Sequence, residues 1–322
     1  MEVRGAVVLV TGASSGIGRA TALAFDRAGA RVALAARRLA RLEAIAAEMS
    51  DALVLRTDLS VDGAAETMVA RTVERFGRLD VLVNNAGAAA PRPADRLTAA
   101  STRALLETNL VAAMVATRAA AEQMRRQGAG HVINVCSPAG FLGIPGMADY
   151  CASKAAMSGW TRALQAEWAG TGIAVTEYLP GLIATELGHP VADGEDGGGP
   201  DRPGDGPGRS ARRRGDDEPA RRAGRPDGGG GAPEGGAAPG PGREDRRRGT
   251  GAAAREGAAR VGPLSALPPE RVADQIVACV RRPRLVVYSD IGARFVTWLS
   301  RSPRLRRAIG AAIARAARRQ RA

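Results

Sequence analysis

The sequence predicts an α/β fold in which short buried strands alternate with helices. The run 6–10 is continuously apolar, which is typical of a strand covered on both faces of a sheet. A glycine-rich turn at 11–18 and a helical pattern at 19–29 follow it directly. Strand, glycine-rich turn and helix start form the context of a dinucleotide site, because the amides at the helix N-terminus can bind a pyrophosphate. The alternative is an ordinary glycine-rich connection.

Composition limits the class of protein. The chain has 322 residues, 45% hydrophobic and 3% aromatic, so we expect one large or two small domains with an aliphatic core. Cys136, Cys151 and Cys279 form no spaced framework, which argues against a disulfide scaffold. We find no signal peptide, no run of 18 apolar residues and no metal motif, so a cytoplasmic location is expected.

The segment after the second predicted strand, 31–35, indicates which cofactor binds. It contains Arg37 and Arg38, where a site that prefers NAD usually has a carboxylate for the ribose 2′-hydroxyl. Guanidinium groups bind a 2′-phosphate well, so NADP is favoured over NAD. The alternative is that Arg38 and Arg41 begin a solvent-exposed helix at 39–49.

Polar residues follow the next two predicted strands, 52–56 and 80–83. Asp58 is placed to contact an adenine amine or to cap a helix that begins at Asp62 and runs to Phe76. Asn85 lies in the Asn-Asn-Ala-Gly run 84–87, where an amide can lock a turn or contact a ligand. A long helical region, 100–127, contains Asn109, whose low helix propensity suggests a specific role, although the spacing also allows a solvent-facing position.

Two further segments contribute to the candidate site. Ser137 follows the strand 131–135, at the edge where such sheets bind ligands, or is an ordinary turn serine. Strand 173–179 ends in the turn Pro180-Gly181, with Thr185 four residues further on.

Tyr150 and Lys154 are the main candidates for chemistry. They are four residues apart at the start of a helical pattern that continues over 155–169, so the phenol and the ammonium share one helix face. A nearby cation stabilises the phenolate, and the pair is predicted to act as an acid/base with a lowered phenol pKa. Lys154 is the only lysine among 46 basic residues, which favours a specific role over a chance Tyr-x-x-x-Lys pattern.

Together these motifs resemble the short-chain dehydrogenases/reductases. TGASSGIG at 11–18, NNAG at 84–87, Asn109, Ser137, YCASK at 150–154 and PGLIAT at 180–185 occur in that family's order and spacing. The resemblance covers roughly 5–187 and resumes near 264–288. It implies a Rossmann-type, doubly wound parallel sheet of about seven strands, and hydride transfer between a nicotinamide and a carbonyl or alcohol.

The resemblance also implies roles for individual residues. Tyr150 would exchange a proton with the substrate oxygen, Lys154 would lower the phenol pKa and hold the nicotinamide ribose, Ser137 would polarise the carbonyl, and Asn109 would keep a water-linked proton path to Lys154. The cofactor-binding residues expected are Gly12, Ser14, Ser15, Gly16, Ile17, Gly18, Arg37, Arg38, Asp58, Asn85, Ala86, Gly87, Tyr150, Lys154, Pro180, Gly181 and Thr185. Relatives commonly form dimers or tetramers through helices matching 101–127 and 150–169.

The segment 192–260 departs from the family. It contains 20 Gly, 8 Pro and 14 Arg in 69 residues, with no Val, Ile, Leu, Met or aromatic residue, so it is predicted to be disordered. Either it is an insertion at the substrate lid, or it is an out-of-frame reading of a GC-rich gene. The predicted organisation is therefore a catalytic domain at 1–191, this segment, a last helix and strand at 261–290, and a tail at 291–322.

The tail carries most of the net charge of +13. Residues 281–322 hold twelve arginines and one aspartate, and two helices are expected at 291–299 and 305–317. Five small or apolar residues line one face of the second: Leu305, Ile309, Ala312, Ile313 and Ala316. A basic amphipathic helix can lie on an anionic membrane. The alternative is packing on the domain or on a second subunit, and nothing in the tail suggests nucleic-acid recognition.

The predicted function is NADP-dependent oxidation or reduction of a ketone or secondary alcohol. The apolar loop 141–147 suggests a hydrophobic substrate. A 3-oxoacyl-thioester reductase shares all the motifs and is the alternative enzyme. A nucleotide-binding scaffold or regulator without catalysis is the alternative of a different class.

Overall fold

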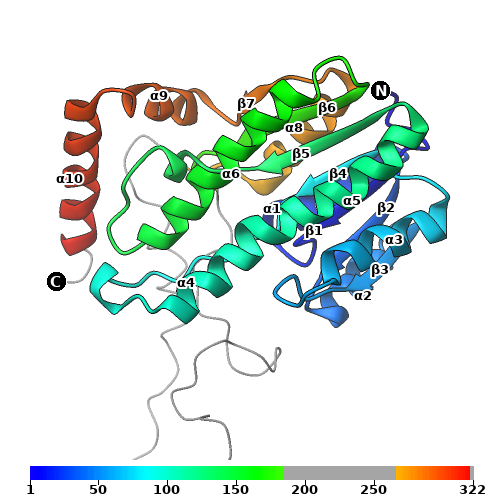
Figure 1. Cartoon of the computed structure of the whole chain (residues 1–322), viewed down its shortest axis with the longest axis horizontal. Coiled ribbons are helices and arrows are strands. Elements are labelled where there is room, and N and C mark those ends of the chain that lie inside the picture. Colours follow the sequence, from blue (N-terminus) through cyan, green and yellow to red (C-terminus); the bar gives the residue numbers. More distant parts are fainter. Residues whose placement is uncertain (184–265, 320–322) are drawn as a thin grey trace, which may run out of the picture. The chain divides into compact units, whose positions relative to one another are not determined.

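A computed structural model describes residues 1–183 and 266–319 and contains one seven-stranded parallel sheet (Figure 1). The strand order is β3-β2-β1-β4-β5-β6-β7, which confirms the predicted doubly wound sheet. The strands are β1 (Val7–Thr11), β2 (Arg31–Ala36), β3 (Ala52–Arg56), β4 (Val81–Asn84), β5 (Gly130–Val135), β6 (Ile173–Leu179) and β7 (Val286–Tyr288).

Helices cover both faces of the sheet, as the continuous apolar strands predict. On β1, Val8 and Val10 pack into one core cluster with α1, α2 and α8, while Val7 and Leu9 pack into a second with α3, α5 and α6 (Figure 1). The helices are α1 (Gly16–Arg27), α2 (Leu39–Ala46), α3 (Ala64–Phe76), α4 (Ala99–Leu106), α5 (Ala112–Gln127), α6 (Ala148–Glu167), α8 (Pro269–Arg281), α9 (Ile291–Leu299) and α10 (Pro303–Arg319).

Two predicted helices have different boundaries. The region 100–127 is not one regular helix, because the π-helical turn η2 (Glu107–Val111) separates α4 from α5. The helix expected from Asp62 begins at Ala64, and its N-cap is Gly63 in the left-handed conformation. Asp58 therefore does not cap this helix. Thr185 and the segment 192–260 lie outside the described residues.

The order in which strands are added to the sheet reverses between β1 and β4. The chain moves outward from β1 through β2 to β3, and then returns to place β4 on the other side of β1. In open α/β sheets, ligands bind beyond the carboxyl ends of the strands at such a switch point. The glycine-rich turn follows β1 at this point, and the Asn-Asn-Ala-Gly run includes the end of β4.

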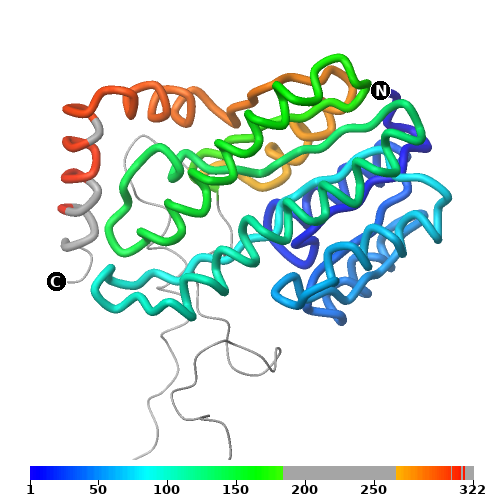
Figure 2. The backbone as a smooth tube through the Cα atoms, viewed as in Figure 1, coloured from blue at the N-terminus to red at the C-terminus, as the bar shows by residue number. Residues whose placement is uncertain are grey.

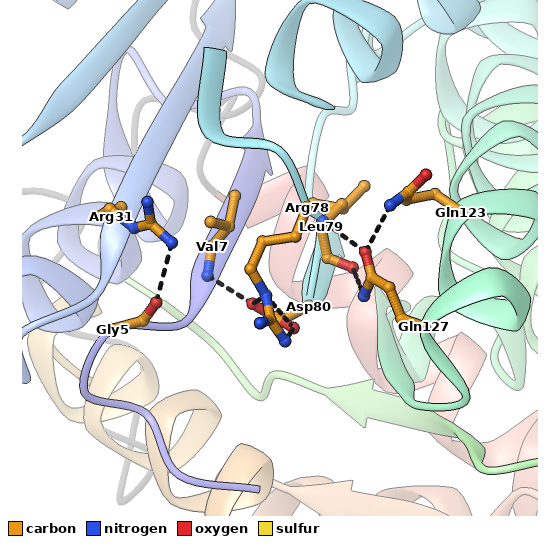
Figure 3. Close-up of polar contacts among 8 residues, drawn as sticks. All are labelled: Gly5, Val7, Arg31, Arg78, Leu79, Asp80, Gln123 and Gln127. Atoms are coloured by element: carbon orange, nitrogen blue, oxygen red, sulfur yellow. Dashed lines mark hydrogen bonds and ion pairs between the residues drawn. The ribbon is translucent and has the colours of Figure 1, made fainter. Parts of the chain in front are cut away.

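At the amino ends of the strands, opposite the switch point, polar side chains form a structural cluster (Figure 3). The buried carboxylate of Asp80 accepts a hydrogen bond of 2.8 Å from the Val7 amide and several from the Arg78 guanidinium. The Gln127 side chain pairs with both backbone groups of Leu79, at 3.0 Å each. These bonds satisfy polar groups at the amino ends of the strands, where the chain would otherwise leave them unpaired.

After β7 the chain continues as α9 and α10 (Figure 2). The predicted helix 291–299 matches α9, and α10 starts two residues before the predicted 305. Among residues 1–183 and 266–319, no helix is both long and apolar enough to span a bilayer.

Candidate active site

The glycine-rich turn after β1 is shaped by close backbone packing. Gly12 has a φ of +67°, a left-handed conformation that favours glycine, and a Cβ on Gly18 would overlap the Gly12 carbonyl oxygen. The side-chain nitrogen Nδ2 of Asn85 donates a hydrogen bond of 2.9 Å to the Thr11 carbonyl oxygen. The same nitrogen lies where a Cβ on Gly18 would point. Of the two roles left open for Asn85, the structure supports locking of the glycine turn.

Arg38 lies over this turn. Its Nε and Nη2 are 3.2 and 3.0 Å from Ser14 Oγ, and its Nη2 is 2.7 Å from Ser15 Oγ. Arg37 instead is exposed, and its charge helps to lower the pKa of Asp58. The structure therefore separates two arginines that the sequence could not rank.

Asp58 is held in a turn of its own beyond β3. Its Oδ1 accepts hydrogen bonds from the Ser60 amide at 3.0 Å and from the Ser60 hydroxyl at 2.7 Å. Partial burial alone would raise its pKa, but the Ser60 hydrogen bonds and the Arg37 charge outweigh this, and the pKa is lowered. The carboxylate lines an open hollow of about 600 Å³ between β3 and α3.

Tyr150 and Lys154 are both buried on α6, as their spacing predicts. Lys154 Nζ lies 6.0 Å from the centre of the Tyr150 ring and donates a 3.0 Å hydrogen bond to the Val135 carbonyl oxygen. The Ser137 hydroxyl is close enough to the Tyr150 phenol to counteract part of the rise in the phenol pKa. Three of the four predicted catalytic residues therefore converge at the carboxyl end of β5.

The expected lowering of the Tyr150 pKa is wrong for this structure. Burial raises the pKa of the phenol, and the Ser137 hydroxyl opposes that rise only in part. Burial also lowers the pKa of the Lys154 ammonium, because the charged form loses its hydration. The sequence indicated the neighbouring cation but not the desolvation of both groups, which depends on the packing around α6.

Asn109, the fourth predicted residue, is fully buried in the π-helical turn rather than facing solvent. Its Oδ1 accepts a hydrogen bond of 2.7 Å from the Ala88 amide. Its Nδ2 donates hydrogen bonds of 2.9 Å to the Ala88 carbonyl oxygen and of 3.1 Å to Ser153 Oγ. It thereby ties the segment after β4 to α6. Asn109 Oδ1 and Lys154 Nζ both face Gly87, each 3.6 Å from the position of a Cβ there.

Two residues near the end of the sheet were missed by sequence reasoning. These residues are Ser289 and Asp290. The Gly181 amide donates a hydrogen bond of 2.7 Å to Ser289 Oγ, and the Ser289 hydroxyl donates one of 2.6 Å to Asp290 Oδ2. Asp290 also caps α9 by accepting 2.7 Å from the Ala293 amide. An Asp directly before a helical pattern is a detectable N-cap signal, but the contact of the neighbouring Ser289 with a turn 108 residues earlier is not. Pro180 is buried beside Gly181.

Comparison with known proteins agrees with this geometry. The model of the family "short chain dehydrogenase" matches residues 6–196. A 3-oxoacyl-[acyl-carrier-protein] reductase from a Synechocystis strain is 36% identical over 186 residues, which are 56% of this chain and 75% of that protein. D-threitol dehydrogenase from Mycolicibacterium smegmatis is 36% identical over 201 residues, which are 60% of this chain and 76% of the relative.

One similar solved structure covers a larger part of the chain. A putative NAD(P)-dependent gluconate 5-dehydrogenase from Beutenbergia cavernae, with NADP bound at low occupancy, is 27% identical with a TM-score of 0.63. That match covers 90% of this chain and 97% of the other. Levodione reductase is 34% identical with a TM-score of 0.55, over 57% of this chain and 74% of that one.

Proposed function

Since this chain belongs to the short-chain dehydrogenase family, and is an oxidoreductase of that family, we propose that it transfers hydride between NADP(H) and a ketone or secondary alcohol. Tyr150 acts as the general acid/base. The observation that carries this proposal is the convergence of the Tyr150 phenol with the Ser137 hydroxyl and the Lys154 ammonium. These groups supply a proton donor, a second hydrogen-bonding group for the substrate oxygen, and a cation.

The residues of the glycine turn fit a dinucleotide. Gly12 and Gly18 let this turn pack closely on itself and on Asn85 and Ala86, at the N-terminus of α1. A turn in this place suits a pyrophosphate, because it lies next to the positive end of the helix dipole. Ser14, Ser15, Gly16 and Ile17 complete this segment in the proposal, together with Ala86, which packs against Gly12, and Gly87.

The cofactor, when bound, supplies or accepts the hydride. In the direction of reduction, the Tyr150 hydroxyl gives its proton to the carbonyl oxygen that gains negative charge. Because burial raises the pKa of Tyr150, the phenol keeps its proton at neutral pH, which is the form that reduction needs. Lys154 stabilises the phenolate that remains, and Ser137 orients the same oxygen. Asn109 positions α6 and the segment after β4 around them.

The preference for NADP rests on Arg38. Its guanidinium lies against Ser14 and Ser15 at the edge of the glycine turn, where it can bind a 2′-phosphate together with these hydroxyls. Asp58 faces the hollow beyond β3 and is the proposed contact for the adenine amine. The similar structure that contains NADP supports the same choice.

The substrate is proposed to be hydrophobic. Leu142, Ile144 and Met147 lie in the loop after Ser137 and are each half-buried. A 3-oxoacyl thioester is the second candidate substrate, favoured by the similarity to the 3-oxoacyl-[acyl-carrier-protein] reductase. A panel that contains acetoacetyl thioesters and apolar ketones separates the two.

The test of catalysis is Tyr150→Phe. Loss of the proton donor is expected to lower kcat by about 10²–10⁴-fold, while the affinity for NADPH stays within about twofold of the wild type. Steady-state reduction of the panel and fluorescence titration with NADPH measure the two quantities. Wild-type protein that binds NADPH but turns over no carbonyl would instead support the non-catalytic scaffold. An unchanged kcat in the variant would remove Tyr150 from the mechanism.

A further inference from the structure

Helix α9 presents its large apolar side chains outward. Ile291, Phe295 and Trp298 are 85%, 54% and 60% exposed, and their spacing of four and three residues places them on one face. The opposite face contains the small residues Ala293, Thr297 and Ser300, which are buried. This is the reverse of a helix that packs on a domain with its apolar side. We call Ile291, Phe295 and Trp298 the α9 apolar face.

The hydrogen bonds of α9 are compatible with this orientation. The Thr297 and Ser300 hydroxyls donate to carbonyl oxygens of the helix, at 2.8 and 2.7 Å, so they can be buried without unsatisfied polar groups. Asp290 caps the first turn and is also hydrogen-bonded to Ser289, which holds the Gly181 amide. Rolling the helix to bury its aromatic residues would expose Ala293 and would disturb the link from Asp290 through Ser289 to the Gly181 amide.

The α9 apolar face is a coherent surface rather than a set of single side chains. The rings of Phe295 and Trp298 stack with centroids 6.1 Å apart and an interplanar angle of 26°. Leu305, in the first turn of α10, is also exposed. Contiguous exposed aromatic and aliphatic groups mark a site that contacts a partner or a membrane.

The charges around this face identify the partner. Residues 291–322 contain nine arginines and no Asp or Glu, and Arg294, Arg301, Arg304 and Arg307 are exposed. A second copy of the chain on this face would bring arginines together, which disfavours association. An anionic lipid surface suits both the arginines and the α9 apolar face, since it attracts positive charge and accommodates aromatic side chains at the headgroup level.

We propose that α9 and the start of α10 dock this oxidoreductase on an anionic membrane surface, with Phe295 and Trp298 inserted at the headgroup level. The contact is peripheral. Aliphatic Ile291 and Leu305 favour lipid over nucleic acid, because they add apolar area that cannot stack on bases. The inference is independent of the cofactor and the substrate proposed above.

Co-sedimentation of the full chain with vesicles tests the proposal. We expect binding to phosphatidylcholine vesicles with about 30% phosphatidylglycerol, and little binding to phosphatidylcholine alone. The double variant Phe295→Ser/Trp298→Ser is expected to bind the anionic vesicles about tenfold or more weakly. Arg304→Gln/Arg307→Gln is expected to weaken binding similarly and to reduce its dependence on salt. Val61→Ser, at a side chain 60% exposed on another part of the surface, is the matched control.

Tryptophan fluorescence gives a second readout. Trp298 is the exposed member of the three tryptophans, since Trp160 is partly buried and Trp168 is buried. Anionic vesicles should shift the emission to the blue, and Trp298→Phe should remove the shift while binding persists. Far-UV circular dichroism confirms that the variants are folded.

Four results would overturn the proposal. One is the absence of binding to anionic vesicles, and another is equal binding by Phe295→Ser/Trp298→Ser. The third is a wild-type oligomer in solution that this double variant reduces to a smaller mass, which would assign the α9 apolar face to a second copy. Capture of a single-stranded oligonucleotide in place of vesicles would contradict the lipid assignment in the same way.

Discussion

At the scale of single residues, Arg37 and Arg38 show how neighbours of the same type acquire different roles. Arg38 contacts the hydroxyls of Ser14 and Ser15 on the glycine turn, whereas Arg37 is exposed and acts on Asp58 through its charge. Strand β2 ends at Ala36, so the two side chains leave the sheet in different directions. The specificity for a 2′-phosphate is therefore expected to reside in Arg38.

Arg38→Ala is expected to weaken NADPH binding by about tenfold or more, and to leave NADH binding nearly unchanged, because charge-assisted hydrogen bonds to a phosphate are lost. Arg37→Ala is the matched control and should change either affinity by about twofold at most. Fluorescence titration with both cofactors measures this. Loss of NADPH affinity in Arg37→Ala alone would reverse the assignment, and equal affinity of the wild type for the two cofactors would refute the preference.

At the scale of elements, the turn η3 (Pro138–Gly140) connects Ser137 with the catalytic helix α6. A Cβ on Gly140 would approach the Ala155 nitrogen and the Lys154 carbonyl carbon to 2.8 Å each. These are backbone atoms of a regular helix and cannot move aside alone. The close approach of the turn to α6 therefore keeps the Ser137 hydroxyl within reach of the Tyr150 phenol.

Gly140→Ala is expected to lower the free energy of unfolding by about 1–3 kcal/mol, since it forces the turn away from α6. It should also lower kcat, because Ser137 and Tyr150 are separated. Gly143→Ala is the control, as a Cβ there meets no atom within 4 Å. Urea unfolding measures the free energy of unfolding of both variants, and steady-state kinetics measures their kcat. Equal effects of the two substitutions would contradict the packing argument.

At the scale of the whole molecule, the two edges of the sheet have different functions. The carboxyl edge carries the candidate site, and the amino edge is closed by polar contacts such as those of Asp80. His131 lies near the amino edge, and its backbone amide donates a hydrogen bond of 2.9 Å to the Asp80 carbonyl oxygen. Its ring is buried, with Nε2 2.8 Å from Thr176 Oγ1, and burial lowers its pKa to about 4.

The depressed pKa of His131 predicts that the folded protein loses stability as the pH falls. Thr176 donates its hydroxyl proton to the Arg284 carbonyl oxygen, so Nε2 is the donor to Thr176. The ring is neutral at pH 7 because its pKa is lowered to about 4. Between the unfolded pKa of about 6.5 and the folded pKa of about 4, the unfolded chain binds more protons, so stability falls as pH decreases through this range.

From pH 7 to pH 4.5 this histidine should remove about 2–3 kcal/mol of unfolding free energy. His131→Gln keeps a donor for Thr176 and does not titrate, so its stability should fall by that much less over the same range. Urea unfolding of both proteins at the two pH values gives the difference. Parallel losses in the two proteins would show that the buried ring does not govern the acid sensitivity.

The sequence by itself determined the sheet, and it predicted most residues of the candidate site. Continuous apolar runs and glycine turns are local signals, and they correctly indicated β3, β6 and α9 to the residue. The order of motifs along the chain was sufficient to place Ser137 near Tyr150, because parallel strands bring their carboxyl ends to one edge.

Only the tertiary structure decided how these residues are paired and solvated. It placed Arg38 on the glycine turn and left Arg37 exposed, buried Asn109 in a π-helical turn, raised the Tyr150 pKa and turned the large apolar residues of α9 outward. Each outcome depends on contacts between segments far apart in the chain. Local sequence patterns specify which face of an element is apolar, but burial and desolvation are set by what the rest of the molecule places against that face.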